Sequence, residues 1–297
     1  MSVAGIARRA LRARWMLLVV LQLGAGLPVR ADVVAIDDAG VRVALAQPAR
    51  RIVALAPHVT ELLFAAGAGA YVVGVVAGSD FPPQAPGIAI VGDANAVDLE
   101  RIVALKPDLV VTWPYTTSAQ LAAIGQRGIA VFTSNARTID AIAGDVERLG
   151  DLAGTRDVAL RAAAAFRADI AASRRGTPGE VPLRVFYEIW GEPIFTVGGA
   201  HLISEAITLC GGENVFAALS VAAPVVSKEA VIAARPQVIV AGADDAKRPA
   251  WLDAWRRWPE IPAVRDDRLR VVDANLLHRA GPRFARGVAQ LCAALRP

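Results

Sequence analysis

Two segments of the chain, residues 98–111 and 227–240, share one order of polar, apolar and helix-stopping residues. Each begins with a residue that can cap a helix, has a glutamate two positions later, and continues through a basic residue and a proline into an aliphatic run. A cap and an acid favour the start of a helix, and the proline ends it before the strand. A helix–strand unit that occurs twice predicts two similar α/β halves.

Short aliphatic runs alternate with helical patterns along most of the chain. We predict a hairpin over residues 33–46, with its turn at residues 37–40. The predicted strands are 51–56, 71–77, 88–91, 109–112, 130–133, 184–189, 194–197 and 238–241, and the predicted helices are 60–66, 99–105, 118–126, 138–152, 155–175, 203–210 and 228–234. Strands that alternate with helices form parallel sheets, so the predicted fold class is α/β.

The predicted helix after Gly154 is capped by Thr155 and has no glycine or proline before about Arg175. Its roughly 20 residues would extend ~30 Å, about the diameter of a small domain. We interpret it as a rigid connector between two lobes; an ordinary surface helix of one domain is the alternative. The predicted parts are a signal peptide (1–31), an N-terminal hairpin (32–50), a first α/β lobe (51–152), the connecting helix (153–178) and a second α/β lobe (179–297).

The N-terminus has the pattern of a secretory signal. A basic stretch, residues 8–14, precedes an apolar stretch, residues 15–27, and Val29-Arg30-Ala31 resembles a cleavage site. A membrane anchor is the alternative, but a spanning helix needs about 20 apolar residues. Cleavage after Ala31 would remove five arginines and change the formal charge from +4 to −1, which argues against nucleic-acid binding. We expect a soluble protein exported to the periplasm.

Short motifs of common enzymes are missing from the sequence. It contains no G-x-S-x-G, H-E-x-x-H or Walker A pattern, so we do not expect an enzyme. The histidines, His58, His201 and His278, fall in predicted loops without the spacing of a zinc site. Local hydrogen bonding is the simpler interpretation of each, and we predict no metal site.

Two groups of aromatic residues have different expected roles. Trp251, Trp255 and Trp258 have helical spacing, which favours packing of a helix on its own core over a ligand platform. A second group lies at or beside the ends of predicted strands: Trp113, Tyr115, Trp190 and Phe195. Parallel sheets bind ligands at the carboxyl ends of their strands, and rings there can cover an apolar ligand.

Five blocks of the sequence resemble a known family: 57–67, 79–83, 99–108, 209–216 and 279–283. They are similar to the helical-backbone metal receptors, the class III periplasmic binding proteins for cobalamin, haem and ferric siderophores, and most similar to the cobalamin branch. The resemblance extends from about residue 50 over nearly the whole remaining chain. It implies two parallel-sheet lobes joined by one long rigid helix.

The resemblance also implies a function and partners. The chain would be a monomer that captures cobalamin (vitamin B12) or a related corrinoid and delivers it to the permease dimer of an ABC importer. The corrinoid would be cargo and no cofactor is implied. Haem, a ferric siderophore or another metal chelate is the alternative ligand, because residues of the pocket decide the function and the fold does not.

The resemblance assigns roles to several residues of this sequence. Trp113 and Phe195 match ligand-facing aromatic residues, and Arg279 matches a polar contact. The further predicted ligand contacts are Ser79, Asp80, Tyr115, Trp190, His201 and Asn275. The sequence departs from the best-known cobalamin binder, because Gly78, Ala94 and Ala223 replace aromatic residues and Asn275 replaces an aspartate. We expect Tyr115, Trp190 and His201 to compensate for the missing rings.

Two acidic residues and two cysteines also match the family pattern. Glu100 and Glu229 match the glutamates, one per lobe, that dock onto arginines of the permease. Simple electrostatics at a helix start is the other interpretation of each glutamate. Cys210 and Cys292 match the paired cysteines of the family, and an even number of cysteines in an exported protein favours a disulfide over two buried thiols.

Overall fold

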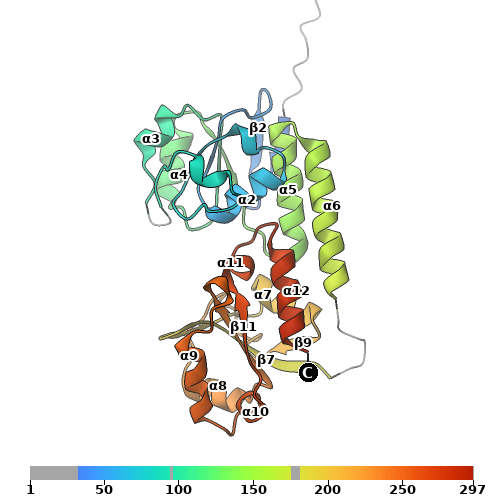
Figure 1. Cartoon of the computed structure of the whole chain (residues 1–297). Helices are drawn as coiled ribbons and strands as arrows, with labels where there is room; N and C mark the ends of the chain where they lie inside the picture. Colours follow the sequence, from blue (N-terminus) through green and yellow to red (C-terminus); the bar gives the residue numbers. More distant parts are fainter. Residues whose placement is uncertain (1–32, 94–95, 175–180, 297) are drawn as a thin grey trace, which may run out of the picture. The chain divides into compact units, whose positions relative to one another are not determined.

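The computed structural model describes residues 33–93, 96–174 and 181–296. The predicted signal peptide, its cleavage site, Ala94 and the last residues of the predicted connecting helix therefore lie outside the described residues. The described chain consists of β-sheets flanked by α-helices (Figure 1). Among these helices, none combines the length and the hydropathy needed to cross a membrane.

The first half contains a hairpin and a parallel sheet. The hairpin pairs β1 (Val33–Ile36) with β2 (Arg42–Leu45) in antiparallel orientation, as predicted. The sheet has the strand order β4-β3-β5-β6, all parallel. Its strands are β3 (Ile52–Ala54), β4 (Val72–Val75), β5 (Leu109–Thr112) and β6 (Ala130–Thr133). The predicted strand 88–91 is wrong, because this segment forms only an isolated bridge between Ile90 and Val75.

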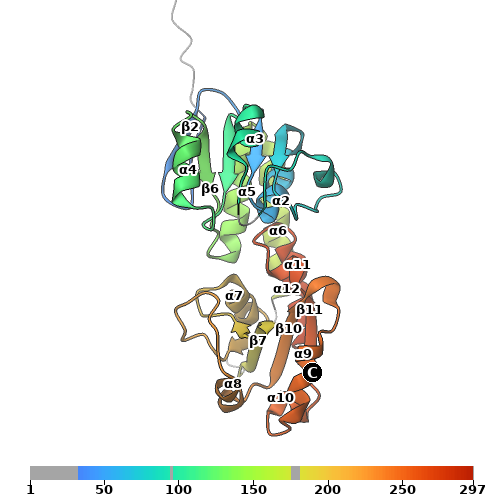
Figure 2. The ribbon, with the colours of Figure 1, turned by 90° about the vertical axis from the view of Figure 1, so that its left-hand side faces the viewer.

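The second half contains a mixed sheet of five strands. Its order is β11-β10-β7-β8, and β9 also pairs with β7. The strands are β7 (Leu183–Gly191), β8 (Ile194–Thr196), β9 (Gly212–Asn214), β10 (Val238–Ala243) and β11 (Leu269–Asp273). Figure 2 shows β7, β10 and β11 side by side. The pair β7–β10 is parallel as predicted. Strands β9 and β11 were not predicted, and they run parallel to β7 and β10. Strand β8 runs antiparallel at the edge because a short turn joins it directly to β7.

The helices cover these sheets. They are α2 (Pro57–Ala65), α3 (Leu99–Ala104), α4 (Ser118–Gly125), α5 (Ile139–Ala153), α6 (Arg156–Ser173), α7 (Leu202–Leu209), α8 (Lys228–Ala234), α9 (Ala250–Asp253), α10 (Pro262–Arg265), α11 (Ala274–Leu277) and α12 (Phe284–Ala294). Short 3₁₀ helices are η3 (Gly69–Tyr71), η4 (Ala85–Gly87), η5 (Asp244–Ala246) and η6 (Ala254–Arg257). The helices predicted from residues 99, 118, 138 and 228 are confirmed within one or two residues at each end.

Helix α2 begins earlier than predicted. Its first residue is Pro57, and no side chain caps it. Proline suits the first turn of a helix because its missing N–H would have no partner there. Thr60, the predicted cap, lies inside the helix, and its hydroxyl donates to Oγ of Ser79 (3.1 Å). The prediction of Thr60 as the cap is therefore wrong. The helix begins about one turn earlier than predicted, and His58 lies in this first turn.

Helices α5 and α6 lie side by side (Figure 1). Gly154, in the left-handed conformation at φ 67°, ends α5. Thr155 stands at the start of α6 without capping it, because its hydroxyl donates to the carbonyl of Ala66 instead (2.6 Å). Helix α6 ends at Ser173, slightly before the predicted end, and packs against both α5 and α12.

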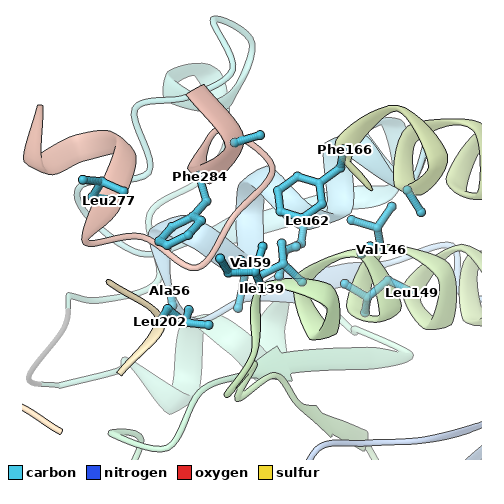
Figure 3. Close-up of a cluster of buried hydrophobic side chains, with 14 of the residues drawn as sticks. Ala56, Val59, Leu62, Ile139, Val146, Leu149, Phe166, Leu202, Leu277 and Phe284 are labelled. Carbon is cyan, nitrogen blue, oxygen red and sulfur yellow. The ribbon is translucent and has the colours of Figure 1, made fainter. Parts of the chain in front are cut away.

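One large buried cluster joins elements that are far apart in the sequence. Figure 3 shows Phe166 of α6 and Phe284 of α12 beside Val59 and Leu62 of α2. Val59, Leu62 and Phe284 are fully buried, and Phe166 is 6% exposed. Removing so many apolar groups from water is the main force that holds these elements together. Helix α2 is therefore fixed in place by contacts along most of its length.

The three tryptophans with helical spacing pack on a core of their own, as predicted. Trp255 is 3% exposed, and Trp251 and Trp258 pack around the same buried cluster. The segment is not one continuous helix, since α9 ends at Asp253 and continues as the 3₁₀ helix η6. The predicted interpretation as core packing is confirmed.

Cys210 and Cys292 form the predicted disulfide, which joins the end of α7 to α12. Replacing both cysteines with alanine is expected to lower the free energy of unfolding by about 4 kcal/mol, because the unfolded chain regains the entropy of a long closed loop. Urea denaturation of the two proteins measures this difference. The intact wild-type protein, unfolded without reductant, should take up no alkylating reagent; uptake at both cysteines would contradict the bridge.

Candidate functional site

Three rings meet where β5 ends. Trp113 follows the last residue of this strand, with its ring centroid 4.7 Å from that of Tyr115 and 5.5 Å from that of His58. The ring of Tyr115 is largely exposed, whereas His58 is buried. Tyr115 thus has ring surface exposed to an outside molecule, as expected for a ring at the carboxyl end of a parallel strand.

His58 was not among the predicted contact residues and was expected in a loop. It lies in the first turn of α2, beside Trp113. Burial, and secondarily the positive charge of Arg279, lowers the pKa of His58 to about 4. Its imidazole is therefore uncharged at neutral pH and free to act as a hydrogen-bond acceptor or metal ligand. The proline at position 57 was the sequence signal that could have placed it in a helix.

Arg279 brings three predicted contact residues together. Its guanidinium donates to both carboxylate oxygens of Asp80, at 2.5 and 3.3 Å, and to Oδ1 of Asn275 at 3.2 Å. These hydrogen bonds are the main cause that lowers the pKa of Asp80. Asp80 comes from the loop after β4, whereas Asn275 and Arg279 come from α11 and the loop after it. The ion pair thus ties a loop of the first half to a loop of the second.

Glu61 lies behind this ion pair and was missed by the sequence analysis. Its side chain is only 1% exposed and accepts hydrogen bonds from Arg283 at 2.7 and 2.9 Å and from Arg279 at 3.4 Å. Arg283 also covers the ring of Phe81, with its guanidinium carbon 4.3 Å from the ring centroid. A buried carboxylate between two arginines holds Arg279 in a defined orientation.

Ser79 and Gly78 shape the loop that carries Asp80. Ser79 is buried and accepts the hydrogen bond from Thr60, so it faces α2. Gly78 has φ +82°, a conformation that side chains rarely adopt. The backbone at position 78 therefore favours glycine, and an aromatic residue would be strained there.

Trp190 and Phe195 stand opposite each other on β7 and β8. Directly paired residues of antiparallel strands carry their side chains on the same face, so the two rings lie on one face of this strand pair. Phe195 also bridges to Val225 in the loop before α8. That loop exposes several aliphatic side chains that sequence reasoning missed: Leu219, Val221 and Val225. They flank Ala223 in the sequence, so the loop that lacks a ring at this position exposes aliphatic side chains nearby.

The other two histidines take part in local hydrogen bonds. His201 caps α7, with its Nδ1 accepting from the backbone N–H of Ile203 (3.1 Å). Burial, and secondarily the nearby His278, lowers the pKa of His201 to about 4. His278 follows α11, and its Nε2 lies 3.0 Å from the hydroxyl of Tyr187. Within the described residues no cluster of three potential metal ligands is found.

Glu100 and Glu229 occupy equivalent positions. Each is the second residue of its helix, α3 or α8, and each is exposed. Hydrogen bonds from its own backbone N–H and from Ser227 lower the pKa of Glu229. The two copies of the repeated unit also share a backbone conformation. Lys106 and Arg235, which precede the prolines, have φ 48° and 46°. The two glutamates are thus presented by two copies of one local structure.

The sequence is similar to those of known periplasmic binding proteins. Residues 52–276 match the family model described as periplasmic binding protein. The chain is 37% identical over 251 residues to a vitamin B12-binding protein of Vibrio cholerae, covering 84% of this chain and 90% of that protein. It is 36% identical over 251 residues to a vitamin B12-binding protein of Yersinia pestis, covering 83% of this chain and 86% of that protein.

Solved structures have the same fold. The periplasmic vitamin B12-binding protein BtuF of Vibrio cholerae superposes with a TM-score of 0.75 at 36% identity, covering 84% of this chain and 97% of that one. The periplasmic heme-binding protein RhuT of Roseiflexus sp. RS-1 superposes with a TM-score of 0.71 at 27% identity, covering 82% and 97%. The chain therefore belongs to the periplasmic binding protein family, with the α/β architecture of its class III members.

Proposed function

We propose that the protein captures cobalamin or a related corrinoid in the periplasm and delivers it to an ABC transporter. The observation that carries the proposal is the cluster of His58, Trp113 and Tyr115 beside Arg279, in a chain similar to vitamin B12-binding proteins. As a member of its family the chain acts as a binding protein and not as an enzyme. The corrinoid is its cargo and not a cofactor.

The chemistry of these residues suits a corrinoid. A corrin is a broad, largely apolar ring edged with amide groups. Aromatic faces such as those of Trp113 and Tyr115 pack on an apolar ring, and Phe195 supplies a similar face from the second half. Arg279 and Asn275 carry donors and an acceptor for amide groups. We include Ser79 and Asp80 in the proposed site as residues of the loop after β4, Trp190 as the partner of Phe195 on β7, and His201 as the residue that caps α7.

Haem is a second candidate ligand. His58 is uncharged at neutral pH and lies beside Trp113, so it could supply the nitrogen ligand that a haem iron accepts. RhuT, whose fold is similar, is a heme-binding protein. We place the corrinoid first because the chain is more similar to vitamin B12-binding proteins, at 37% identity, than to RhuT, at 27%.

We further propose the arrangement of the parts. Helix α6 is the rigid helix that joins a first lobe, residues 51–152, to a second lobe, residues 179–297. The protein acts as a monomer, and Glu100 and Glu229 each dock onto one subunit of a permease dimer. The equal placement of the two exposed glutamates in α3 and α8 supports this docking.

Titration calorimetry tests the ligand. Cyanocobalamin and cobinamide are each expected to bind to the mature protein with a stoichiometry of one and to release heat at micromolar protein concentration. Haem is expected to bind more weakly. Binding of haem with no heat from either corrinoid would overturn the corrinoid assignment and favour the second candidate.

Replacing Trp113 with alanine is expected to weaken corrinoid binding by about 1–3 kcal/mol, because a ring that packs on the ligand is lost from the contact. The same calorimetric titration measures the change. Trp113→Phe keeps an aromatic face and should retain most of the affinity. Equal affinities of the alanine variant and the wild type would remove Trp113 from the site.

A further inference from the structure

A small cavity lies beside β7 in the second half of the chain. Its volume is about 220 Å³, and tryptophans make up much of its lining. They are Trp190, Trp251, Trp255 and Trp258. The ring centroids of Trp255 and Trp258 are 5.5 Å apart. This volume is below the roughly 300 Å³ at which pockets for drug-sized ligands begin, so a corrinoid is far too large for it.

A buried carboxyl group, that of Glu188, lies in this aromatic cavity. Glu188 is 1% exposed and contributes to the lining. Its Oε2 accepts a hydrogen bond from Nε1 of Trp255 (2.8 Å), whereas its Oε1 has no hydrogen-bond partner among the described residues. Burying a carboxyl group is costly unless it is fully paired, so a half-paired one at a cavity wall favours a ligand that would complete its interactions.

At Gly191, the backbone of β7 lies close against the ring of Trp251. A Cβ atom at Gly191 would stand 2.5 Å from both Cβ and Cγ of Trp251. No side chain larger than hydrogen fits there without displacing the ring. The glycine therefore sets the position of Trp251 at the cavity wall, and the wall is built by close packing.

We propose that this cavity is a second binding site, which shares only Trp190 with the proposed corrinoid site, for a small quaternary methylammonium cation with Glu188 as its counter-ion. Indole faces attract cations more strongly than other aromatic rings do. A quaternary ammonium has no N–H to satisfy, so it needs aromatic faces and one negative charge more than it needs several acceptors. The cavity offers that combination.

The charged groups around Glu188 do not neutralise it. Glu192 and Lys228 also line the cavity, and they face each other at 3.9 Å. On the neighbouring α9 and η6, Asp253 is exposed and pairs with Arg248 and Arg256. None of these five groups forms a hydrogen bond or an ion pair with Glu188 among the contacts of the described residues. A cation entering the cavity would thus be the charged partner of this carboxyl group.

Ionisation of Glu188 makes cation binding depend on pH. Burial raises the pKa of Glu188 to about 8, so the group is mostly protonated at pH 7. A cation favours the ionised form, and its binding would release a proton. Its affinity is expected to rise with pH up to about 8, by as much as about tenfold per pH unit, and to level off above it.

Calorimetry with choline as the probe tests the site. Wild-type protein is expected to bind choline at pH 8 and not to bind 3,3-dimethylbutan-1-ol, an uncharged molecule of the same shape. At pH 7, titrations in two buffers of different ionisation enthalpy should reveal a released proton. Equal binding of the two probes, no binding of choline, or binding without proton release would each overturn the proposal.

Glu188→Gln separates the charge from the shape of the site. This variant keeps the volume of the side chain and is expected to bind choline at least tenfold more weakly, whereas Glu192→Gln should change affinity less than threefold. The corrinoid affinity of Glu188→Gln should equal that of the wild type, which also reports that the variant is folded. Unchanged choline affinity in Glu188→Gln would overturn the assignment of the counter-ion, whatever the outcome of the corrinoid titrations.

Discussion

Replacement of Glu61 with alanine is expected to lower the free energy of unfolding by about 3–5 kcal/mol. The carboxylate is 1% exposed, and the side chains of its partners Arg279 and Arg283 are 19% and 17% exposed. Removing it leaves two poorly hydrated guanidinium groups without a buried counter-charge, and such a loss costs much more than breaking a surface ion pair. Urea denaturation with linear extrapolation measures the change.

An exposed ion pair provides the matched control. Asp266 pairs with Arg265 on the surface, and Asp266→Ala should cost less than about 1 kcal/mol. A loss below about 1 kcal/mol in Glu61→Ala would show that the buried pair contributes no more than this surface pair. Corrinoid affinity should also fall in Glu61→Ala, because Arg279 loses one of the carboxylates that orient it.

Ligand binding in a milder variant distinguishes orientation from folding. Glu61→Gln keeps an acceptor oxygen for Arg283 but removes the charge. If Glu61 orients Arg279, this variant should bind the corrinoid more weakly at temperatures where it remains folded. Retained affinity in a folded Glu61→Gln protein would limit Glu61 to a role in stability.

The sequence was most informative where local signals agree. Strands β5 and β6 have the predicted bounds because each is a buried aliphatic run between clear helix signals. The start of α2 was misplaced because Thr60 resembles a cap, although Pro57 already fits the first turn. Residues 88–91 are apolar enough for a strand but pair with β4 at a single bridge. Local pattern cannot tell how far such a pairing extends.

The site was harder to predict than the fold because its contacts join residues distant in sequence. Trp113 and Tyr115 could be found from their place after a strand, and their rings do meet. Glu61 and Arg283 are 222 residues apart, and an acidic residue inside a helix normally indicates a solvated face. Only the packing of α2 among other helices buries this glutamate, so no single segment of sequence reveals it.

The two copies of the helix–strand unit show what a repeat can add. Alone, each glutamate is explained by its place at the positive end of a short helix. The repeat places both at the same position of equivalent helices, leaves both exposed, and even gives Lys106 and Arg235 the same rare backbone conformation. A partner with two equivalent subunits could bind both units in the same way. Stabilisation of each helix end alone would not require the two glutamates to occupy equivalent positions.

Replacing both Glu100 and Glu229 with arginine is therefore expected to abolish corrinoid import while leaving corrinoid affinity unchanged. Charges at a wet interface set the register and rate of association, and reversed charges would repel the arginines proposed on the permease. Uptake of labelled cobalamin by a reconstituted importer measures transport, and calorimetry measures affinity. The single changes Glu100→Ala and Glu229→Ala should each reduce uptake by less than the double reversal does.

A second double reversal controls for the change in net charge. Glu213 and Glu260 are also exposed, and changing both to arginine alters the total charge by the same amount without touching α3 or α8. This control should import cobalamin normally, because an effect of overall charge would act on both double variants alike and would be screened by salt. Restored uptake by Glu100→Arg/Glu229→Arg when the facing permease arginines are changed to glutamate would identify the contact directly. Normal uptake by Glu100→Arg/Glu229→Arg with the unchanged permease would instead indicate that both glutamates only stabilise the starts of their helices.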